Sequence, residues 1–237
     1  RSALQLGAGR VYLGLLARAA PPVDFSQPEL MLRTPPELFK LNLLDGLVVG
    51  PGLGQEPEAL PWLNSALSSE LALVLDADAL NLIALHPHLA KKLSQRKSAS
   101  ILTPHPAEAA RLLKTDTAAI QNDRMNAARQ IAQQFNGYVV LKGAGSICCF
   151  PDGKRYLNTS GNPGLSTAGT GDVLAGMIGA LIAQRLNPDY ALLLAVYLHG
   201  AAANHRLQHN HGPLGMTASE IITSARSLLN DWIYNPA

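Results

Sequence analysis

Short apolar runs that do not alternate with polar residues most constrain what this chain can fold into. Such runs lie at 47–50, 71–75 and 100–103, and each leads into a glycine, aspartate or proline–histidine segment. Unbroken apolar runs are typical of strands in a parallel sheet that is covered on both faces. Helical patterns separate them, as at 57–67. The alternation predicts an α/β fold with a mostly parallel central sheet.

The second half of the chain predicts a change in strand direction. Strands are expected at 138–142, 146–150 and 155–157, with Pro151-Asp152-Gly153 as a hairpin turn, so antiparallel strands join the sheet late. The spacing of apolar residues predicts one amphipathic helix over 117–135 and three final helices at about 172–185, 188–209 and 217–231. Without repeats or a linker, residues 1–237 are interpreted as a single domain.

Charge and composition exclude several classes of partner. The net charge is +2 and no long Lys/Arg run occurs, so nucleic-acid binding is not expected. No stretch is long and apolar enough to span a membrane, and the first residues lack a signal-peptide layout. The two cysteines, Cys148 and Cys149, are adjacent in an apolar run and indicate a reducing compartment. We therefore expect a cytoplasmic protein with a small-molecule substrate.

The run from Asn162 to Asp172, followed by apolar residues, predicts a phosphoryl-transfer site. A loop of small residues ends in Gly169-Thr170-Gly171-Asp172, where an apolar helix begins. Free N–H groups at a helix start attract anions, and glycines allow a phosphate to come close. Asp172 is a candidate base beside that anion site. The alternative is that Asp172 only caps the helix and the glycines only turn the chain.

Two further glycine segments follow strands. Lys142-Gly143-Ala144-Gly145-Ser146 is interpreted as a backbone cradle for a nucleotide, with Lys142 near its negative charge; the alternative is a plain hairpin turn. Residues 50–54, ending at Gly54, resemble a dinucleotide-binding loop only loosely. They allow either a close approach to substrate or a simple strand-to-helix turn.

Histidines and carboxylates give weaker signals. His105 lies between two prolines at a strand end, which leaves a ligand-binding role and a structural role both open. Asp76 and Asp78 either hold Mg²⁺ through water or cap a helix, with Asn81 bonding a nearby loop. The histidines of the next-to-last helix and its end are interpreted as a partly exposed helix face, and no metal site is expected; they are His199, His205, His209 and His211.

Taken together, five ordered motifs resemble the ADP/ATP-dependent NAD(P)H-hydrate dehydratases, a ribokinase-like group that is also found as the C-terminal part of YjeF-type bifunctional proteins. The resemblance implies a three-layer α/β/α sandwich and covers nearly the whole chain. The motifs are Val49–Gly54, Asp76–Asn81, Thr103–Glu108, Leu141–Gly145 and Asn162–Gly176.

The resemblance also implies a reaction and site roles. The S epimer of hydrated NADH or NADPH is restored by phosphorylation of the ring hydroxyl and loss of phosphate, with ADP or ATP as donor and Mg²⁺ on the phosphates. Asp172 is then the base, and Ala3, Gly54 and His105 contact the hydrated dinucleotide. The N–H groups around Gly169, Thr170 and Gly171 stabilise the transferring phosphoryl group, and residues 142–146 hold the nucleotide.

Two departures from the family pattern and several open alternatives remain. Ala107 stands where the family usually has glycine, which costs strain only if the backbone there needs a positive φ. Residues 4–11 resemble the end of the family's first helix and its second strand, so the first strand is expected to be missing from this chain. An upstream epimerase domain and a homo-oligomer are expected. The alternative functions are a small-molecule kinase acting on a vitamin precursor or sugar, and a non-catalytic nucleotide-binding module.

Overall fold

The computed structural model describes residues 1–17 and 19–235, and it divides their strands between two sheets. The larger sheet has six strands in the order β3-β4-β5-β6-β7-β8, and β1 and β2 form a separate parallel pair. Pairing is parallel from β3 to β6 and antiparallel from β6 to β8. The strands are β1 (Tyr12–Gly14), β2 (Met31–Arg33), β3 (Gly46–Val49), β4 (Ala72–Leu75), β5 (Ser100–Leu102), β6 (Tyr138–Leu141), β7 (Ile147–Cys149) and β8 (Arg155–Leu157).

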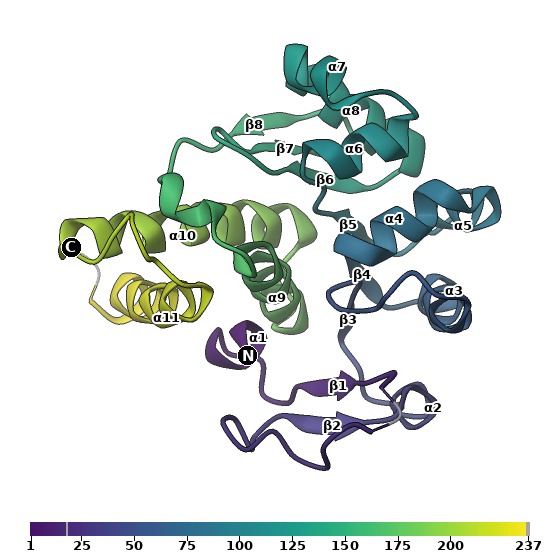
Figure 1. Cartoon of the computed structure of the whole chain (residues 1–237), viewed down its shortest axis with the longest axis horizontal. Helices are drawn as coiled ribbons and strands as arrows, with labels where there is room; N and C mark the ends of the chain where they lie inside the picture. The colour runs from purple at the N-terminus through teal and green to yellow at the C-terminus, as the bar shows by residue number, and fades with distance from the viewer. Residues whose placement is uncertain (18, 236–237) are drawn as a thin grey trace.

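Helices cover both faces of the six-stranded sheet, so the expected three-layer α/β/α architecture is confirmed (Figure 1). The first group lies between β2 and β6 in the chain: α2 (Pro35–Leu38), the 3₁₀ turn Pro57–Ala59, α3 (Leu60–Ser68), α4 (Ala77–Leu85), α5 (Pro87–Ser94), α6 (Pro106–Leu113), α7 (Thr117–Asn122) and α8 (Arg124–Phe135). The others are α1 (Ser2–Gln5), the 3₁₀ turn Pro163–Ser166, α9 (Thr170–Ala183), α10 (Pro188–Gln208) and α11 (Ala218–Tyr234).

The apolar runs are unbroken because each central strand packs against helices on both faces. In β4, Leu73 and Leu75 belong to the apolar cluster under α3–α8, whereas Val74 belongs to the cluster under α9–α11. Adjacent side chains of a strand point to opposite faces, so two cores require apolar residues at every position. The register aligns Val74 with Val48 and Ile101 of the neighbouring strands.

The prediction of one helix over 117–135 is wrong. The structure has two helices there, α7 and α8, with Asp123 between them. Asp123 has φ −144° and ψ 69°, and its carboxylate accepts a hydrogen bond from Asn126 N–H at 3.1 Å, so it caps the second helix. A short polar side chain that bonds the backbone competes with a continuous helix. The hairpin at 151–153 and the three final helices are confirmed.

The N-terminal strand pair stands apart from the main sheet (Figure 1). Within the described residues β3 pairs only with β4, and β1 pairs only with β2. Helix α1 rests on α9, where a Cβ added to Gly176 would lie 1.9 Å from Ser2 Oγ. The glycine therefore allows the N-terminal helix to approach the helix that begins with the Gly-Thr-Gly-Asp segment.

Candidate functional site

The ends of four strands and the start of α9 converge at one edge of the main sheet. Gly50 follows β3, Asp76 follows β4, Thr103 follows β5 and Lys142 follows β6. The carboxyl ends of parallel strands share an edge, which is where open α/β sheets bind ligands. The structure thus brings together motifs that are far apart in the sequence.

Asp172 lies in the first turn of α9 and is not its cap. The N-cap residue is Gly169, with φ 85°, and no side chain bonds the free N–H groups there. Among the described residues no hydrogen bond or ion pair uses the Asp172 carboxylate, so the interpretation as a mere helix cap is not supported. Partial desolvation, together with the negative charges of Asp76 and Asp78, raises the pKa of Asp172. A carboxylate held in this way is a better proton acceptor than an ordinary aspartate.

The N–H groups at this helix start are not all free. Thr170 N–H donates to the carbonyl of Thr167 at 3.4 Å. The Thr170 hydroxyl donates to the carbonyls of Leu165 at 2.7 Å and Thr167 at 2.9 Å, so this side chain shapes the loop. Gly171 precedes Asp172 in the first turn, where N–H groups have no partner within the helix. The N–H groups of Gly169, Gly171 and Asp172 have no acceptor among the described backbone groups, so an anion bound at this helix start would meet these three groups.

Lys142 points toward Asp76 and the start of α9. Its ammonium lies 2.8 Å from Asp76 Oδ1 and 3.9 Å from Glu108 Oε2. A Cβ added to Gly171 would lie 3.2 Å from the same ammonium group. The side chains of Asp76 and Glu108 are buried and that of Lys142 is mostly so. This places a cation beside the helix start that carries Asp172.

His105 is the N-cap of α6. Its Nδ1 accepts hydrogen bonds from the N–H groups of Ala107 at 3.1 Å and Glu108 at 3.3 Å, and Nε2 lies 3.3 Å from Glu108 Oε1. Burial lowers the pKa of His105, although Glu108 opposes the shift. Both ring nitrogens have partners in the protein, and the exposed ring face remains open to a ligand. Ala107 lies inside α6 and has no positive φ, so its replacement of glycine costs no strain.

The glycine loop after β3 is held close to β4. Gly50 has φ 129°, and a Cβ there would lie 1.7 Å from the carbonyl oxygen of Asp76, so only glycine fits. At the other end of the loop, Gly54 N–H donates to Asp78 Oδ2 at 2.9 Å. Asp78 thus orients the loop, and Asn81 accepts from Arg111 at 2.9 Å, where the sequence predicted a bond to a nearby loop.

The turn after β6 has open N–H groups and a cation behind it. Gly143 and Gly145 have φ 146° and 66°, and the Ser146 hydroxyl donates to the Gly143 carbonyl at 3.1 Å. Arg124 donates to the Gly145 carbonyl at 3.1 Å from behind the turn. Sequence analysis missed Arg124; its only local signal is an arginine in the first turn of the helix that precedes the strand.

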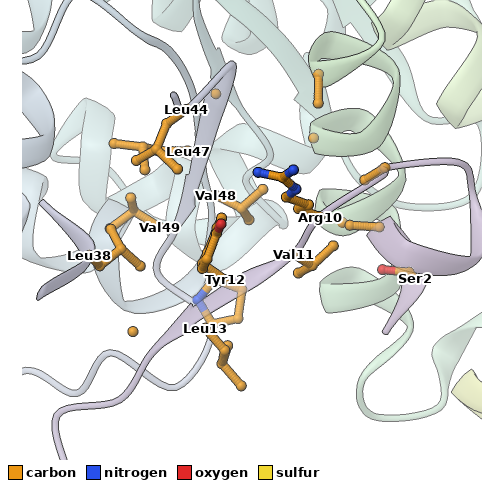
Figure 2. A pocket seen from close by; sticks show the side chains of 18 of the residues that line it. Ser2, Arg10, Val11, Tyr12, Leu13, Leu38, Leu44, Leu47, Val48 and Val49 are labelled. Carbon is orange, nitrogen blue, oxygen red and sulfur yellow. The ribbon is translucent and has the colours of Figure 1, made fainter. Parts of the chain in front are cut away.

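A cleft of about 890 Å³ separates the two sheets and reaches Asp172. Apolar side chains from both sheets point into it, among them Tyr12, Leu47 and Val49 (Figure 2). Strand β1, which pairs only with β2 among the described residues, and strand β3, which pairs only with β4, both border the cleft. Ala3 and Asp172 line it, whereas Gly54 and His105 lie outside its lining.

The prediction that all four C-terminal histidines form a partly exposed face is wrong for His199. Its side chain is buried, because α10 packs against α9 and α11 there, and its Nε2 has no partner among the described residues. His209 and His211 are exposed and His205 is half-buried. In the part of the chain that the structure describes, no three His, Cys, Asp or Glu side chains are grouped to hold a metal, and no helix is long and apolar enough for a membrane span.

A family model and individual relatives of known name both match this chain. A family model described as NAD(P)H-hydrate dehydratase matches residues 1–226. The chain is 42% identical over 232 residues to the ADP-dependent (S)-NAD(P)H-hydrate dehydratase of Neisseria meningitidis, which covers 97% of this chain and 78% of the relative. A bifunctional NAD(P)H-hydrate repair enzyme of Coxiella burnetii is 38% identical over 97% of this chain, which spans 46% of that longer protein.

A solved structure agrees with these matches. The ADP/ATP-dependent NAD(P)H-hydrate dehydratase of Bacillus subtilis, co-crystallised with ATP and Mg²⁺ and soaked with CoA, superposes with a TM-score of 0.84. It is 28% identical, and the superposition covers 98% of this chain and 84% of that one.

Proposed function

Because the chain belongs to the NAD(P)H-hydrate dehydratase family and has the ribokinase-like fold, we propose that it restores the S epimer of hydrated NADH or NADPH to the reduced dinucleotide. The observation that carries the proposal is the carboxylate of Asp172 in the first turn of α9, which has no hydrogen-bond or ion-pair partner among the described residues. It lies on the wall of a cleft and near the Lys142 ammonium. A base beside an anion site is the arrangement that phosphoryl transfer to a hydroxyl requires.

Asp172 takes the proton of the ring hydroxyl as the hydroxyl oxygen attacks the terminal phosphoryl group of the donor. With ADP as donor, the bond to AMP breaks and a phosphate ester forms on the ring. The carbon–oxygen bond of the ester then breaks, and phosphate leaves with the electron pair. The neighbouring ring carbon loses a proton to solvent, and the electrons of that C–H bond re-form the double bond. The N–H groups at Gly171 and Asp172 and the charge of Lys142 stabilise the negative charge on the transferring group.

The turn at 143–146 is the proposed nucleotide site. Its N–H groups are not used by any other described part of the backbone, so they are available to an anionic ligand. Lys142 links this turn to the helix start, because it follows β6 while its ammonium reaches Gly171. ADP and ATP both meet these requirements, and the name of the Neisseria relative favours ADP.

Mg²⁺ fits this edge as an ion held mainly by the nucleotide phosphates. Asp76 Oδ1 is engaged by Lys142, while Oδ2 would lie 3.9 Å from a Cβ at Gly171 and faces the helix start. Mg²⁺ in nucleotide sites is usually held by one or two carboxylates, phosphates and water. Asp76 Oδ2 would hold it through water, and the ion would neutralise phosphate charge.

The hydrated dinucleotide is proposed to lie across the cleft mouth. Ala3 supports this placement because α1 rests on α9 at Gly176, one turn after Asp172. Gly54 and His105 are proposed to contact the parts of the dinucleotide outside the cleft. His105 would make this contact through the face of its imidazole ring, because Nδ1 accepts hydrogen bonds from N–H groups of α6 and Nε2 lies beside Glu108.

Partnership with an NAD(P)H-hydrate epimerase is part of the proposal. A reaction that accepts only one epimer leaves the other epimer unrepaired. An epimerase must therefore convert the unaccepted epimer into the accepted one. The bifunctional relatives support this pairing. The homo-oligomer, the cytoplasmic location and the single domain remain predictions.

The test is to mix the protein with hydrated NADH or NADPH, Mg²⁺ and ADP, ATP or no nucleotide, and to follow the return of reduced-dinucleotide absorbance. We expect recovery only with nucleotide, and a loss of roughly 10²–10⁴-fold in Asp172→Asn, the usual contribution of a general base. Asp152→Asn, an exposed hairpin aspartate, is the control. No recovery in any mixture overturns the proposal, and a stable phosphorylated product would support a kinase instead.

A further inference from the structure

In the part of the chain that the structure describes, the cation behind the turn at 143–146 has no anionic partner. Arg124, the first residue of α8, is half-buried, and among the described residues it forms no ion pair. Burial lowers the pKa of its guanidinium. A buried charge is costly unless something compensates for it. Its partners are instead backbone carbonyl groups.

Arg124 Nη2 binds the turn at both ends. It donates to the carbonyls of Leu141 at 3.2 Å, Lys142 at 3.4 Å and Gly145 at 3.1 Å. The planar guanidinium suits this task, because it directs several donors in a fixed geometry. These three hydrogen bonds hold the carbonyl groups of the turn on the side of Arg124.

The fit between Arg124 and Gly143 is close. A Cβ added to Gly143 would lie 2.4 Å from Arg124 Nη1 and 2.9 Å from Nη2. The glycine is therefore needed for the guanidinium as well as for its φ of 146°. Two features that the sequence separates by almost twenty residues form one unit in the structure.

The N–H groups of the turn remain available as donors. The N–H groups of Gly143, Ala144, Gly145 and Ser146 donate to no other described backbone group or side chain. Successive free N–H groups in a glycine turn form a concave anion site. The Arg124 guanidinium adds positive potential at the turn, since no carboxylate of residues 1–17 or 19–235 forms an ion pair with it.

We propose that Arg124 is a positioning residue for nucleotide binding: it holds the carbonyls of the turn on one side so that the N–H groups meet the donor nucleotide on the other. This inference rests on the proposed function of the turn. Arg124 itself does not touch the reacting atoms. Its loss therefore raises the KM for the nucleotide and leaves kcat at saturating nucleotide close to that of the unchanged protein.

The experiment measures ADP binding directly by calorimetry, in the full chain and without the hydrated dinucleotide. Arg124→Ala is expected to weaken ADP binding about tenfold or more, the usual effect of losing hydrogen bonds to a charged group. Ethylguanidinium added to Arg124→Ala is expected to restore part of the affinity. Arg124→Lys keeps the charge without the planar group and is expected to bind with intermediate affinity.

Arg129→Ala is the matched control. Arg129 lies on the same helix, but it is exposed and donates to Asn126 at 2.7 Å. Thermal unfolding of each variant checks that it is folded. Unchanged ADP affinity in folded Arg124→Ala, or an equal loss in Arg129→Ala, overturns the inference. Failure of the unchanged protein to bind ADP overturns the proposed nucleotide site itself.

A double-variant cycle covers the case in which Arg124→Ala folds poorly. Gly143→Ala alone is expected to displace the guanidinium and weaken ADP binding. Arg124→Lys lacks the Nη groups that the new Cβ would meet. In that background, Gly143→Ala is therefore expected to weaken ADP binding less than it does in the unchanged protein. Equal effects of Gly143→Ala in both backgrounds would contradict the proposed unit.

Discussion

The ammonium of Lys142 lies 2.8 Å from Oδ1 of Asp76, whose side chain is only 1% exposed. The two residues follow β6 and β4, and β5 lies between those strands. The pair therefore ties two strand ends together across the sheet edge where the proposed site lies. Glu108 adds a second carboxylate 3.9 Å from the same ammonium.

Lys142→Met is expected to destabilise the fold by about 3 kcal/mol, because it leaves the buried Asp76 carboxylate without its cation. Urea unfolding measures this. Lys154→Met is the control: Lys154 pairs with Asp152 on the surface at 2.8 Å, and solvent screens such an exposed pair, so its loss should cost far less than the loss of the buried one. Similar losses in the two variants would contradict the structural role of the buried pair.

Asp172→Asn is expected to raise stability at neutral pH while it lowers activity by roughly 10²–10⁴-fold. The pKa of Asp172 is higher in the folded than in the unfolded protein, so protonated Asp172 contributes to the free energy of unfolding. This contribution is fully present below the unfolded pKa and is lost as pH rises through the folded pKa. Asparagine carries no charge and avoids that loss. The expected gain in the free energy of unfolding is less than about 1 kcal/mol, because solvent screens the exposed side chain.

Thermal unfolding at neutral and acid pH checks the sign. The gain of Asp172→Asn should disappear in acid, where Asp172 is protonated. The Lys154 side chain lowers the pKa of Asp152, so Asp152→Asn should lose stability at neutral pH. A gain in both variants would point to a general effect of net charge.

The acid limb of kcat is expected to lie above the range of an ordinary aspartate, because Asp172 acts as a base only when ionised and its pKa is raised. Asp78 contributes to that shift, so Asp78→Asn should move the limb to lower pH. Asparagine still offers an oxygen to Gly54 N–H. A pH–rate profile of both proteins measures this; a limb that does not move in Asp78→Asn contradicts the electrostatic origin of the shift.

Gly50→Ala and Gly52→Ala are expected to differ strongly. A Cβ at Gly50 would lie 1.7 Å from the Asp76 carbonyl oxygen, so the loop must move away from β4. We expect a loss of more than about 3 kcal/mol there. At Gly52, with φ 64° and no atom within 4 Å, only backbone strain of about 1 kcal/mol is expected. Thermal unfolding compares them, and equal losses would contradict the close approach.

The buried His199 is expected to make the fold sensitive to mild acid. Burial lowers the pKa of His199 to about 4, so the neutral form of this side chain contributes to the free energy of unfolding. The contribution is present above the unfolded pKa and is lost as pH falls toward the folded pKa. The loss between those pH values is at most about 3 kcal/mol. His199→Phe should flatten the dependence of Tm on pH, whereas the exposed His209→Phe should leave it unchanged. An identical acid loss in His199→Phe would assign the loss to other groups.

Local patterns were sufficient for most elements and insufficient for some boundaries. The strands predicted at 71–75 and 138–142 are observed at 72–75 and 138–141; they could be predicted because the observed strands are apolar at every position, which two-sided burial requires. The helix at 117–135 was predicted as one because periodicity does not register a cap such as Asp123 inside a helical pattern. His199 was misjudged for a related reason: α10 is apolar on several sides, so spacing does not show which side is covered.

By itself, the sequence determined the α/β architecture, the strand ends that carry the motifs and the candidate base Asp172, because burial on both faces and glycine turns leave local marks in a chain. Only the tertiary structure decided that Lys142 reaches Asp76, that His105 caps α6 and that Arg124 lies behind Gly143. Such contacts join residues from different elements. They depend on how strands and helices pack in space, which no local pattern of residues records.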